Sequence, residues 1–289
     1  MTAEEMDMTW WQSIILGIVE GVTEFLPVSS TGHLTIVEKL MGMPIEDPGI
    51  TAYTAIIQIG AILAAVIFFW RDIVRIVKAW FAGLRQESRR DADYNMGWAV
   101  IVGTVITAGV ALLGENLITG ALRSMWVVAI GLIVWSVAMF AADRYSARLD
   151  DSRKRSLDSI TWKDGALLGL VQCISLAPGV SRSGATIVGG LFSGLDRVAA
   201  TKLSFYLGIP ALTAAGIFQA ATEFSNVSDT VGWGVTILGM VVSFFVAYAS
   251  IAWLLKFVAT NTFTSFVVYR VVVGVAIIGL LLGGVITAI

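Results

Sequence analysis

The sequence has little cysteine, histidine or charge, and each shortage excludes something. The single cysteine, Cys173, excludes an intramolecular disulfide and any metal site built from several thiolates. The single histidine, His33, excludes within one subunit any mechanism that needs two imidazoles. Charged residues make up 14% of the 289 residues, whereas soluble domains carry about a quarter. The composition is therefore not that of an ordinary soluble globular protein.

Apolar residues take the place of the missing charge: 57% of the chain is hydrophobic and its mean hydropathy is +0.82. Uncharged apolar stretches lie at 51–70, 97–114, 124–142, 203–222, 230–255 and 271–289. Each is close to the ~20 residues that a helix needs to cross a bilayer. No alternating strand pattern appears, and a backbone in lipid must satisfy its own hydrogen bonds. We therefore predict an all-α integral membrane protein.

One stretch of the chain occurs twice. Residues 16–34 align without a gap with residues 168–186, at an offset of 152. Proline, glycine and serine interrupt both copies, and this combination ends one helix and favours the start of another. Each copy is therefore predicted to be a re-entrant helix hairpin, at about 12–42 and 164–194, that dips into the membrane and returns to its own side.

Three full spans follow each hairpin in this interpretation, so the two halves are predicted to be inverted repeats within one membrane domain. The first repeat covers residues 1–145, with its hairpin at 12–42 and spans at 51–70, 97–114 and 124–142. The second covers residues 146–289, with its hairpin at 164–194 and spans at 203–222, 230–255 and 264–287.

Positive charge is concentrated in two segments that are predicted to be loops. Of the 19 lysines and arginines, six lie in residues 71–95 and six in residues 143–163. The positive-inside rule places both segments in the cytoplasm and both termini outside. Arg270 lies a few residues inside the last span, and we expect its long side chain to extend to the membrane surface.

Glu20 and Glu24 are four residues apart, so they share one helix face in the first hairpin. Two like charges repel each other, and their burial in hydrocarbon adds to the cost. Either both are protonated and bonded to backbone, or they bind a divalent cation or tune a nearby proton acceptor. We favour the functional alternatives, with Glu20 and Glu24 as ligands of the metal.

His33 follows the break of the first hairpin, directly after the hydroxyls of Ser29, Ser30 and Thr31. A lone histidine is usually a satisfied core group. Here it lies in an apolar element with three hydroxyls and two carboxylates nearby. Imidazole can act as a nucleophile or proton shuttle near neutral pH, so we predict a catalytic role.

Arg182 occupies the corresponding part of the second hairpin, among Ser181, Ser183 and Thr186. A helix start rich in glycine and serine offers free backbone N–H groups to an anion. The guanidinium adds a planar fork that suits phosphate oxygens. The alternative is a structural arginine paired with a carboxylate of the other hairpin, and one side chain can do both.

The two motifs resemble those of the undecaprenyl-diphosphate phosphatase family, also called bacitracin-resistance proteins. The first runs from Glu20 through Ser29-Ser30-Thr31-Gly32-His33, and the second is Pro178-Gly179-Val180-Ser181-Arg182-Ser183-Gly184-Ala185-Thr186. The resemblance implies an integral membrane hydrolase that removes the terminal phosphate of a C55 polyprenyl diphosphate. It thereby recycles the cell-wall lipid carrier and confers antibiotic resistance.

The resemblance also implies the site. By this resemblance the expected catalytic residues are Glu20, Glu24, Ser30, His33 and Arg182, with Ser181 and Thr186 as substrate contacts. The neighbouring hydroxyls of Ser29, Thr31 and Ser183 are also expected to contact the substrate. A divalent cation, Mg²⁺ or Ca²⁺, is expected on the two glutamates. Whether Ser30 or His33 attacks phosphorus stays open, with a slight preference for His33 as general base or nucleophile and Ser30 as nucleophile or phosphate ligand.

The implied setting is the bacterial inner membrane, with the active site open to the outer or periplasmic face. The expected partners are the polyprenyl diphosphate and the bilayer, with no nucleic acid, and a homodimer is left open. Two alternatives compete with this interpretation. The type-2 phosphatidic-acid phosphatase mechanism needs two histidines, and this chain has one. The second alternative is a flippase that moves the lipid carrier across the membrane and is built on the same inverted repeat.

Overall fold

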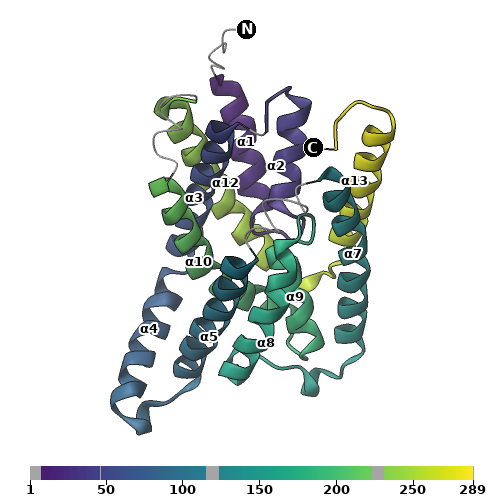
Figure 1. Cartoon of the computed structure of the whole chain (residues 1–289). Coiled ribbons are helices and arrows are strands. Elements are labelled where there is room, and N and C mark those ends of the chain that lie inside the picture. The colour runs from purple at the N-terminus through teal and green to yellow at the C-terminus, as the bar shows by residue number, and fades with distance from the viewer. Residues whose placement is uncertain (1–7, 46, 115–123, 223–230, 289) are drawn as a thin grey trace.

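The computed structural model describes residues 8–45, 47–114, 124–222 and 231–288, which form helices joined by turns and short loops (Figure 1). Two hairpins carry the duplicated stretches: α1 (Trp10–Thr23) with α2 (Ser30–Leu40), and α8 (Trp162–Cys173) with α9 (Arg182–Phe192). Within the described residues, six helices are long and apolar enough to cross a membrane: α3 (Pro48–Phe68), α5 (Ala92–Leu113), α7 (Met125–Arg148), α10 (Arg197–Thr222), α12 (Trp233–Thr260) and α13 (Thr264–Leu282). The prediction of an all-α integral membrane protein is confirmed.

Both hairpins begin with the same helix-capping motif. Thr9 precedes α1 and forms a capping box with Gln12, and Thr161 precedes α8 and forms one with Asp164. A capping box satisfies two backbone N–H groups that a helix start otherwise leaves free. The two boxes are 152 residues apart, the offset of the sequence repeat, so the duplication is visible in helix capping as well as in sequence.

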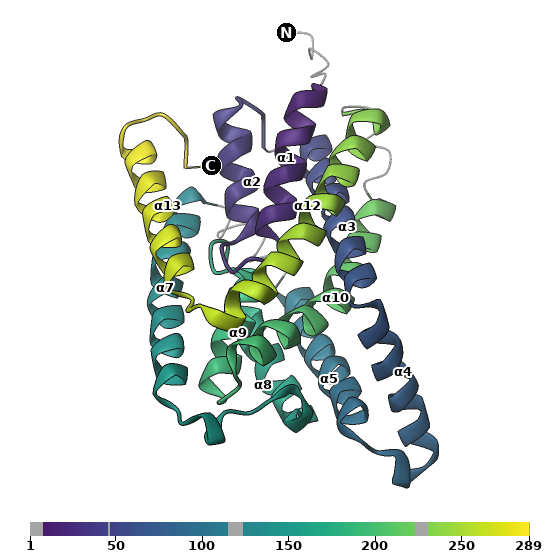
Figure 2. The same ribbon diagram turned by 180° about the vertical axis from the view of Figure 1, so that it is seen from behind.

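The two hairpins lie at opposite ends of the molecule. In Figures 1 and 2, the α1–α2 hairpin occupies the end where α13 finishes, and the α8–α9 hairpin occupies the other end. Each returns to the end from which it started, and the two bends meet in the interior, where Ser183 Oγ donates to the carbonyl of Leu26 at 3.0 Å. The relation of the halves as an inverted repeat stays a prediction, as do their boundaries.

Each hairpin packs against a long helix from the other half of the chain. α1 crosses α12, where a Cβ added to Gly17 would come within 2.6 Å of the carbonyl oxygen of Gly239. α8 crosses α5 in the same way, with Gly169 against the carbonyl of Gly103, also at 2.6 Å. Glycine is required at both crossings because the backbones approach this closely. The halves are therefore interlocked rather than side by side.

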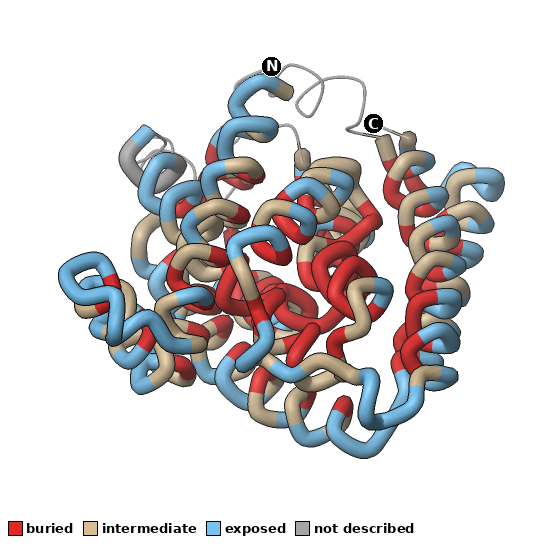
Figure 3. Tube along the Cα trace, turned by 90° about the horizontal axis from the view of Figure 1, so that it is seen from below, coloured by how far each residue is buried: buried red, intermediate tan, exposed pale blue. Residues whose placement is uncertain are grey.

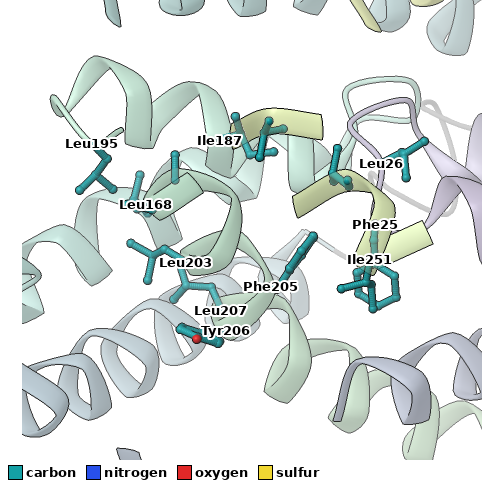
Figure 4. Close-up of a cluster of buried hydrophobic side chains, with 14 of the residues drawn as sticks. Phe25, Leu26, Leu168, Ile187, Leu195, Leu203, Phe205, Tyr206, Leu207 and Ile251 are labelled. Atoms are coloured by element: carbon teal, nitrogen blue, oxygen red, sulfur yellow. The ribbon is translucent and has the colours of Figure 1, made fainter. Parts of the chain in front are cut away.

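Among the described residues, the largest apolar core runs from the first hairpin bend to α8, α9 and α10 (Figure 4). Phe25, in the first bend, meets Phe205 of α10 edge to face, with ring centroids 5.4 Å apart. Such a geometry is favourable for aromatic pairs. Viewed from below, buried residues gather on the inner sides of the helices and exposed ones face outward (Figure 3). The core thus packs the first bend, with Glu24 beside Phe25, against the second hairpin and α10.

One predicted loop is wrong. The first part of the basic segment 71–95 belongs to a helix, α4 (Trp70–Arg85), which packs against α5. Its apolar residues Ile73, Ile76 and Trp80 recur at helical spacing, and Trp80 meets Trp98 of α5 with centroids 5.6 Å apart. The second basic segment is also shorter as a loop, because α7 continues to Arg148. The hairpins and spans begin or end a few residues from their predicted limits.

Candidate active site

Each hairpin bend ends in a serine with a strained backbone. Ser29 has φ 76° and Ser181 has φ 78°, and among the described residues these are the two non-glycine residues with positive φ. Such a conformation costs on the order of 1–3 kcal/mol and is concentrated at functional sites. The two serines are 152 residues apart and directly precede α2 and α9. Both helices therefore present their N-terminal N–H groups to the interior.

Glu24 joins the two hairpins at the centre of the molecule. The hydroxyl of Ser30 donates to Glu24 Oε2 at 2.6 Å, and Arg182 Nη2 donates to Glu24 Oε1 at 3.2 Å. Arg182 Nη1 also donates to the carbonyl of Ser204 at 3.3 Å. A hydroxyl, a carboxylate and a guanidinium thus form one connected group, although about 150 residues separate its ends.

Two buried polar atoms at this site have no hydrogen-bond partner: Arg182 Nε, within the group, and Glu20 Oε1. Leaving such an atom unsatisfied costs about 1–3 kcal/mol, and more for a charged group. Gly208 of α10 leaves the room that the guanidinium occupies, because a Cβ there would overlap Arg182 Nη1. The site therefore keeps donor and acceptor capacity that the protein itself does not use.

The structure places His33 between Ser29 and Tyr269, and its predicted catalytic role stays a prediction. Its Nδ1 lies 2.8 Å from the carbonyl oxygen of Ser29, and its Nε2 lies 2.7 Å from the hydroxyl of Tyr269. Since a carbonyl only accepts, Nδ1 carries the proton in the neutral ring and Nε2 accepts from Tyr269. No hydrogen bond joins His33 to either predicted carboxylate or to Ser30 within the described residues. The group bonded to the Ser30 hydroxyl is Glu24.

The hydroxyls of the second hairpin mostly hold the bend together. Ser183 bonds Leu26 of the first hairpin, and Ser181 Oγ lies 3.1 Å from Ser183 Oγ and accepts from the N–H of Gly184. Thr186 is fully buried and donates to Gln172 of α8 and to the carbonyl of Arg182. Thr186 therefore bonds within its own hairpin and not to the Glu24 group, and its predicted contact with the substrate stays a prediction.

A cavity of about 230 Å³ reaches the site from the end where α13 finishes. It is lined by polar residues of three helices, among them Glu20, Ser30, Thr31, Glu38, Thr54 and Gln58. Pro178 of the second hairpin closes part of its wall. The cavity thus joins the Ser30 hydroxyl and the unsatisfied Glu20 carboxylate to one end of the molecule.

The residues present fit a divalent cation with the substrate as co-ligand. Among the described residues, no group of three or more His, Cys, Asp and Glu side chains gathers to hold an ion by itself. Mg²⁺, however, is commonly held by one or two carboxylates together with substrate phosphates and water. Glu20 Oε1 is buried and unsatisfied, and Glu20 lines the same cavity as Glu38. Glu24 has both its oxygens engaged by Ser30 and Arg182.

Comparison with known proteins decides the family. The family model described as bacitracin resistance protein BacA matches residues 13–276. The chain belongs to this family. The undecaprenyl-diphosphatase of Cutibacterium acnes is 54% identical over 289 residues, which cover 97% of this chain and all of the relative. Undecaprenyl-diphosphatase 3 of Frankia casuarinae is 49% identical, over 96% of this chain and 98% of the relative. The undecaprenyl-diphosphatase of a Mycobacterium species is 44% identical, over 98% of this chain and all of the relative.

Sequence reasoning missed two residues at the centre of this BacA family protein. Tyr269 holds His33, and nothing in its sequence context pointed to that contact. Arg270 was expected to reach the membrane surface, which is wrong: its side chain is fully buried and bonded to carbonyls of both hairpin bends. A charged residue inside an apolar span is expensive unless it is paired, and that signal alone could have drawn attention to Arg270.

Proposed function

We propose that this protein hydrolyses undecaprenyl diphosphate to undecaprenyl phosphate and inorganic phosphate, which recycles the cell-wall lipid carrier and confers bacitracin resistance. Its family and the names of its relatives support this reaction. The observation that carries it is the Ser30–Glu24–Arg182 group at the meeting point of the two hairpins. This group supplies a nucleophile, a proton acceptor and an anion ligand within contact of one another.

Ser30 is the proposed nucleophile and Glu24 its base. Glu24 Oε2 takes the hydroxyl proton as Ser30 Oγ forms a bond to the terminal phosphorus. The bond from that phosphorus to the bridging oxygen breaks, and undecaprenyl phosphate leaves. Water then attacks the phosphoserine, Glu24 returns its proton to Ser30 Oγ, and the phosphate departs with both protons of the water. The hydrogen bond from Ser30 supports Glu24, rather than His33, as the base.

Arg182 is proposed to bind the phosphate oxygens. Its Nε has no partner among the described residues, and Arg182 is the first residue of α9, whose N-terminus faces the interior. Phosphoryl transfer depends mainly on positioning and on neutralising charge, which a planar guanidinium at a helix start provides. His33 is proposed to support the bend by bonding the carbonyl of the strained Ser29.

A divalent cation is proposed on Glu20, with Glu24 as the second predicted ligand. When bound, the ion would neutralise charge on the diphosphate oxygens. Glu20 is the better supported of the two, because one of its oxygens is buried without a partner and the residue lines the cavity. Glu24 already serves Ser30 and Arg182.

The site is proposed to open to the outer face of the bacterial inner membrane. α4, with its arginines, lies at the end opposite to the start of α1 (Figure 1). The positive-inside rule places that basic end in the cytoplasm. The cavity reaches the other end, beside Ile45 and Ala288, so the headgroup would enter from outside. The comparisons give no support to the flippase alternative, and a homodimer stays a prediction.

Phosphate release by the purified protein tests the proposal. Wild type with undecaprenyl diphosphate in detergent should release inorganic phosphate, and Ser30→Ala should lower the rate by about a thousandfold or more, as removal of a nucleophile does. Ser193→Ala is the matched control and should keep wild-type turnover, because its hydroxyl lies in the second hairpin and bonds the carbonyl of Gly189 in its own hairpin.

The two candidate nucleophiles differ in the bond they form. With radiolabelled substrate, an acid-stable phosphoserine is expected, whereas an acid-labile phosphohistidine would reassign the attack to His33. A wild-type protein that releases no phosphate would refute the proposed function.

A further inference from the structure

Arg270 of α13 is the largest fully buried side chain in the described part of the protein. Every nitrogen of its guanidinium donates at least one hydrogen bond. The hydrogen bonds go to Pro27 O at 3.0 Å, Gly179 O at 2.8 Å, Gly131 O and Leu132 O at 3.4 Å each, and Ser136 Oγ at 3.1 Å. Within the described residues no carboxylate forms an ion pair with it. A buried charge without a counter-charge is costly, so these bonds must compensate it.

The two shortest of these bonds reach equivalent points of the duplicated stretches. Pro27 and Gly179 are 152 residues apart, the offset of the repeat, and each stands two residues before a serine with positive φ. Nη1 binds the first carbonyl and Nη2 the second. One planar guanidinium therefore spans the two bends at matching positions.

α7 anchors the same guanidinium from a third side. Ser136 accepts from Nε, and Gly131 lies so close to the second bend that a Cβ there would come within 2.5 Å of the carbonyl oxygen of Pro178. The arginine is thus fixed relative to a full span, and the two bends are fixed relative to the arginine. The bends carry Ser30 on one side and Arg182 on the other.

We propose that Arg270 is a positioning residue that sets the register between the two hairpin bends and so holds Ser30 and Arg182 at the spacing one phosphate group requires. It acts through the carbonyls of Pro27 and Gly179 and does not touch the substrate. The inference rests on the proposed function for its kinetic test, and a structural test of the register is independent of that function.

A planar fork, and not merely a positive charge, is what the geometry requires. Lysine keeps the charge but is a single point donor, so it cannot bridge both carbonyls in the plane that Nη1 and Nη2 define. If Arg270 served only by its positive potential near the phosphate, lysine would replace it. Arg270→Lys therefore separates the two roles.

The kinetic test measures phosphate release from undecaprenyl diphosphate. Arg270→Lys should lower kcat about 100-fold with little change in KM, because a misplacement on the order of 1 Å has that effect while Arg182 still captures the phosphate. Arg270→Met should be at least as impaired. Ile277→Ala, a buried position on the same helix, is the control: it lowers the melting temperature but should leave kcat unchanged. Wild-type kcat in Arg270→Lys, or an equal loss in Ile277→Ala, would overturn the proposal.

The structural test measures the distance between the hairpins. Spin labels at Leu40→Cys and Phe192→Cys, in a Cys173→Ser background, mark the far ends of α2 and α9, where both side chains are about half exposed. Double electron–electron resonance should give a shifted or broadened distance distribution in Arg270→Lys and an unchanged one in Ile277→Ala. An unaltered distribution in Arg270→Lys would refute the register role even if the protein proved to have another activity. Should Arg270→Met fail to fold, the lysine variant decides both tests.

Discussion

At the scale of the residue, Arg182 serves two partners in one plane. It donates to Glu24 and to the carbonyl of Ser204 while its Nε stays unsatisfied. Arg182→Lys keeps the charge but loses the fork, so we expect kcat/KM to fall about 100-fold or more. Phosphate release measures this. Arg144→Lys, on the exposed end of α7, is the matched control, and a near-normal rate in Arg182→Lys would show that the fork is not needed.

Glu20 and Glu24 have different proposed roles, as cation ligand and as base, and a Mg²⁺ titration should distinguish them. Glu20 has a free buried oxygen, so Glu20→Gln should raise the Mg²⁺ concentration needed for half-maximal activity. Glu24→Gln should abolish turnover at any Mg²⁺ concentration, because the proton acceptor of Ser30 is lost. Rates are measured across a Mg²⁺ series after chelation. Full wild-type activity in excess chelator would remove the metal from the scheme.

At the scale of the element, helix α10 leaves room for the guanidinium of Arg182 because residue 208 is a glycine. Gly208→Ala places a methyl group where Arg182 Nη1 lies, and a flexible side chain moves more easily than a helix. The protein should therefore fold, with about 1 kcal/mol gained in helix propensity, while kcat falls about as far as in Arg182→Lys. Gly109→Ala, with open space around its Cβ, is the control. Equal activity of the two variants would contradict this account.

The start of α8 is tied to the loop before it by an ion pair that depends on pH. Burial alone would raise the pKa of Asp164, but the hydrogen bonds from Arg155 and Thr161 outweigh it and hold that pKa below its ordinary value. The folded pKa is the lower one, so the stabilisation is complete above about pH 3.9 and is lost as pH falls through the folded value. Melting temperatures between pH 5 and pH 2.5 should drop more steeply in wild type than in Asp164→Asn. Parallel curves would show that the pair contributes nothing.

Elements set by local signals were predictable from the sequence, and those set by distant contacts were not. The hairpins follow from their proline, glycine and serine residues, and the spans from uninterrupted apolar runs. Helix α4 was not predicted because its arginines made the segment look like a solvent-exposed loop. Its residues Ile73, Ile76 and Trp80 nevertheless form an apolar helix face, and α4 packs against α5. The pairing of Glu24 with Arg182 was foreseen as an alternative. The partners of His33 and Arg270 lie up to 243 residues away in sequence, so no local pattern encodes them.

At the scale of the whole molecule, the proposed orientation can be tested by labelling. In a Cys173→Ser background, Pro44→Cys lies in the connection between α2 and α3, and Ser156→Cys lies between α7 and α8, at the opposite end (Figure 2). Both positions are exposed. A membrane-impermeant maleimide should label Pro44→Cys in intact cells and Ser156→Cys only after permeabilisation, as the positive-inside rule requires. The reverse pattern would turn the cavity toward the cytoplasm.

The crossing of α1 with α12 has a consequence for how the protein is made. Ser13 donates to the carbonyl of Val235, 222 residues later in the chain. A ribosome adds about 5–20 residues per second, so some ten to forty seconds pass between the synthesis of the two ends of that bond. During this time the helix that carries Glu20 is without its final neighbour. The newly made hairpin therefore completes this contact only after α12 has been synthesised, when the last fifth of the chain arrives.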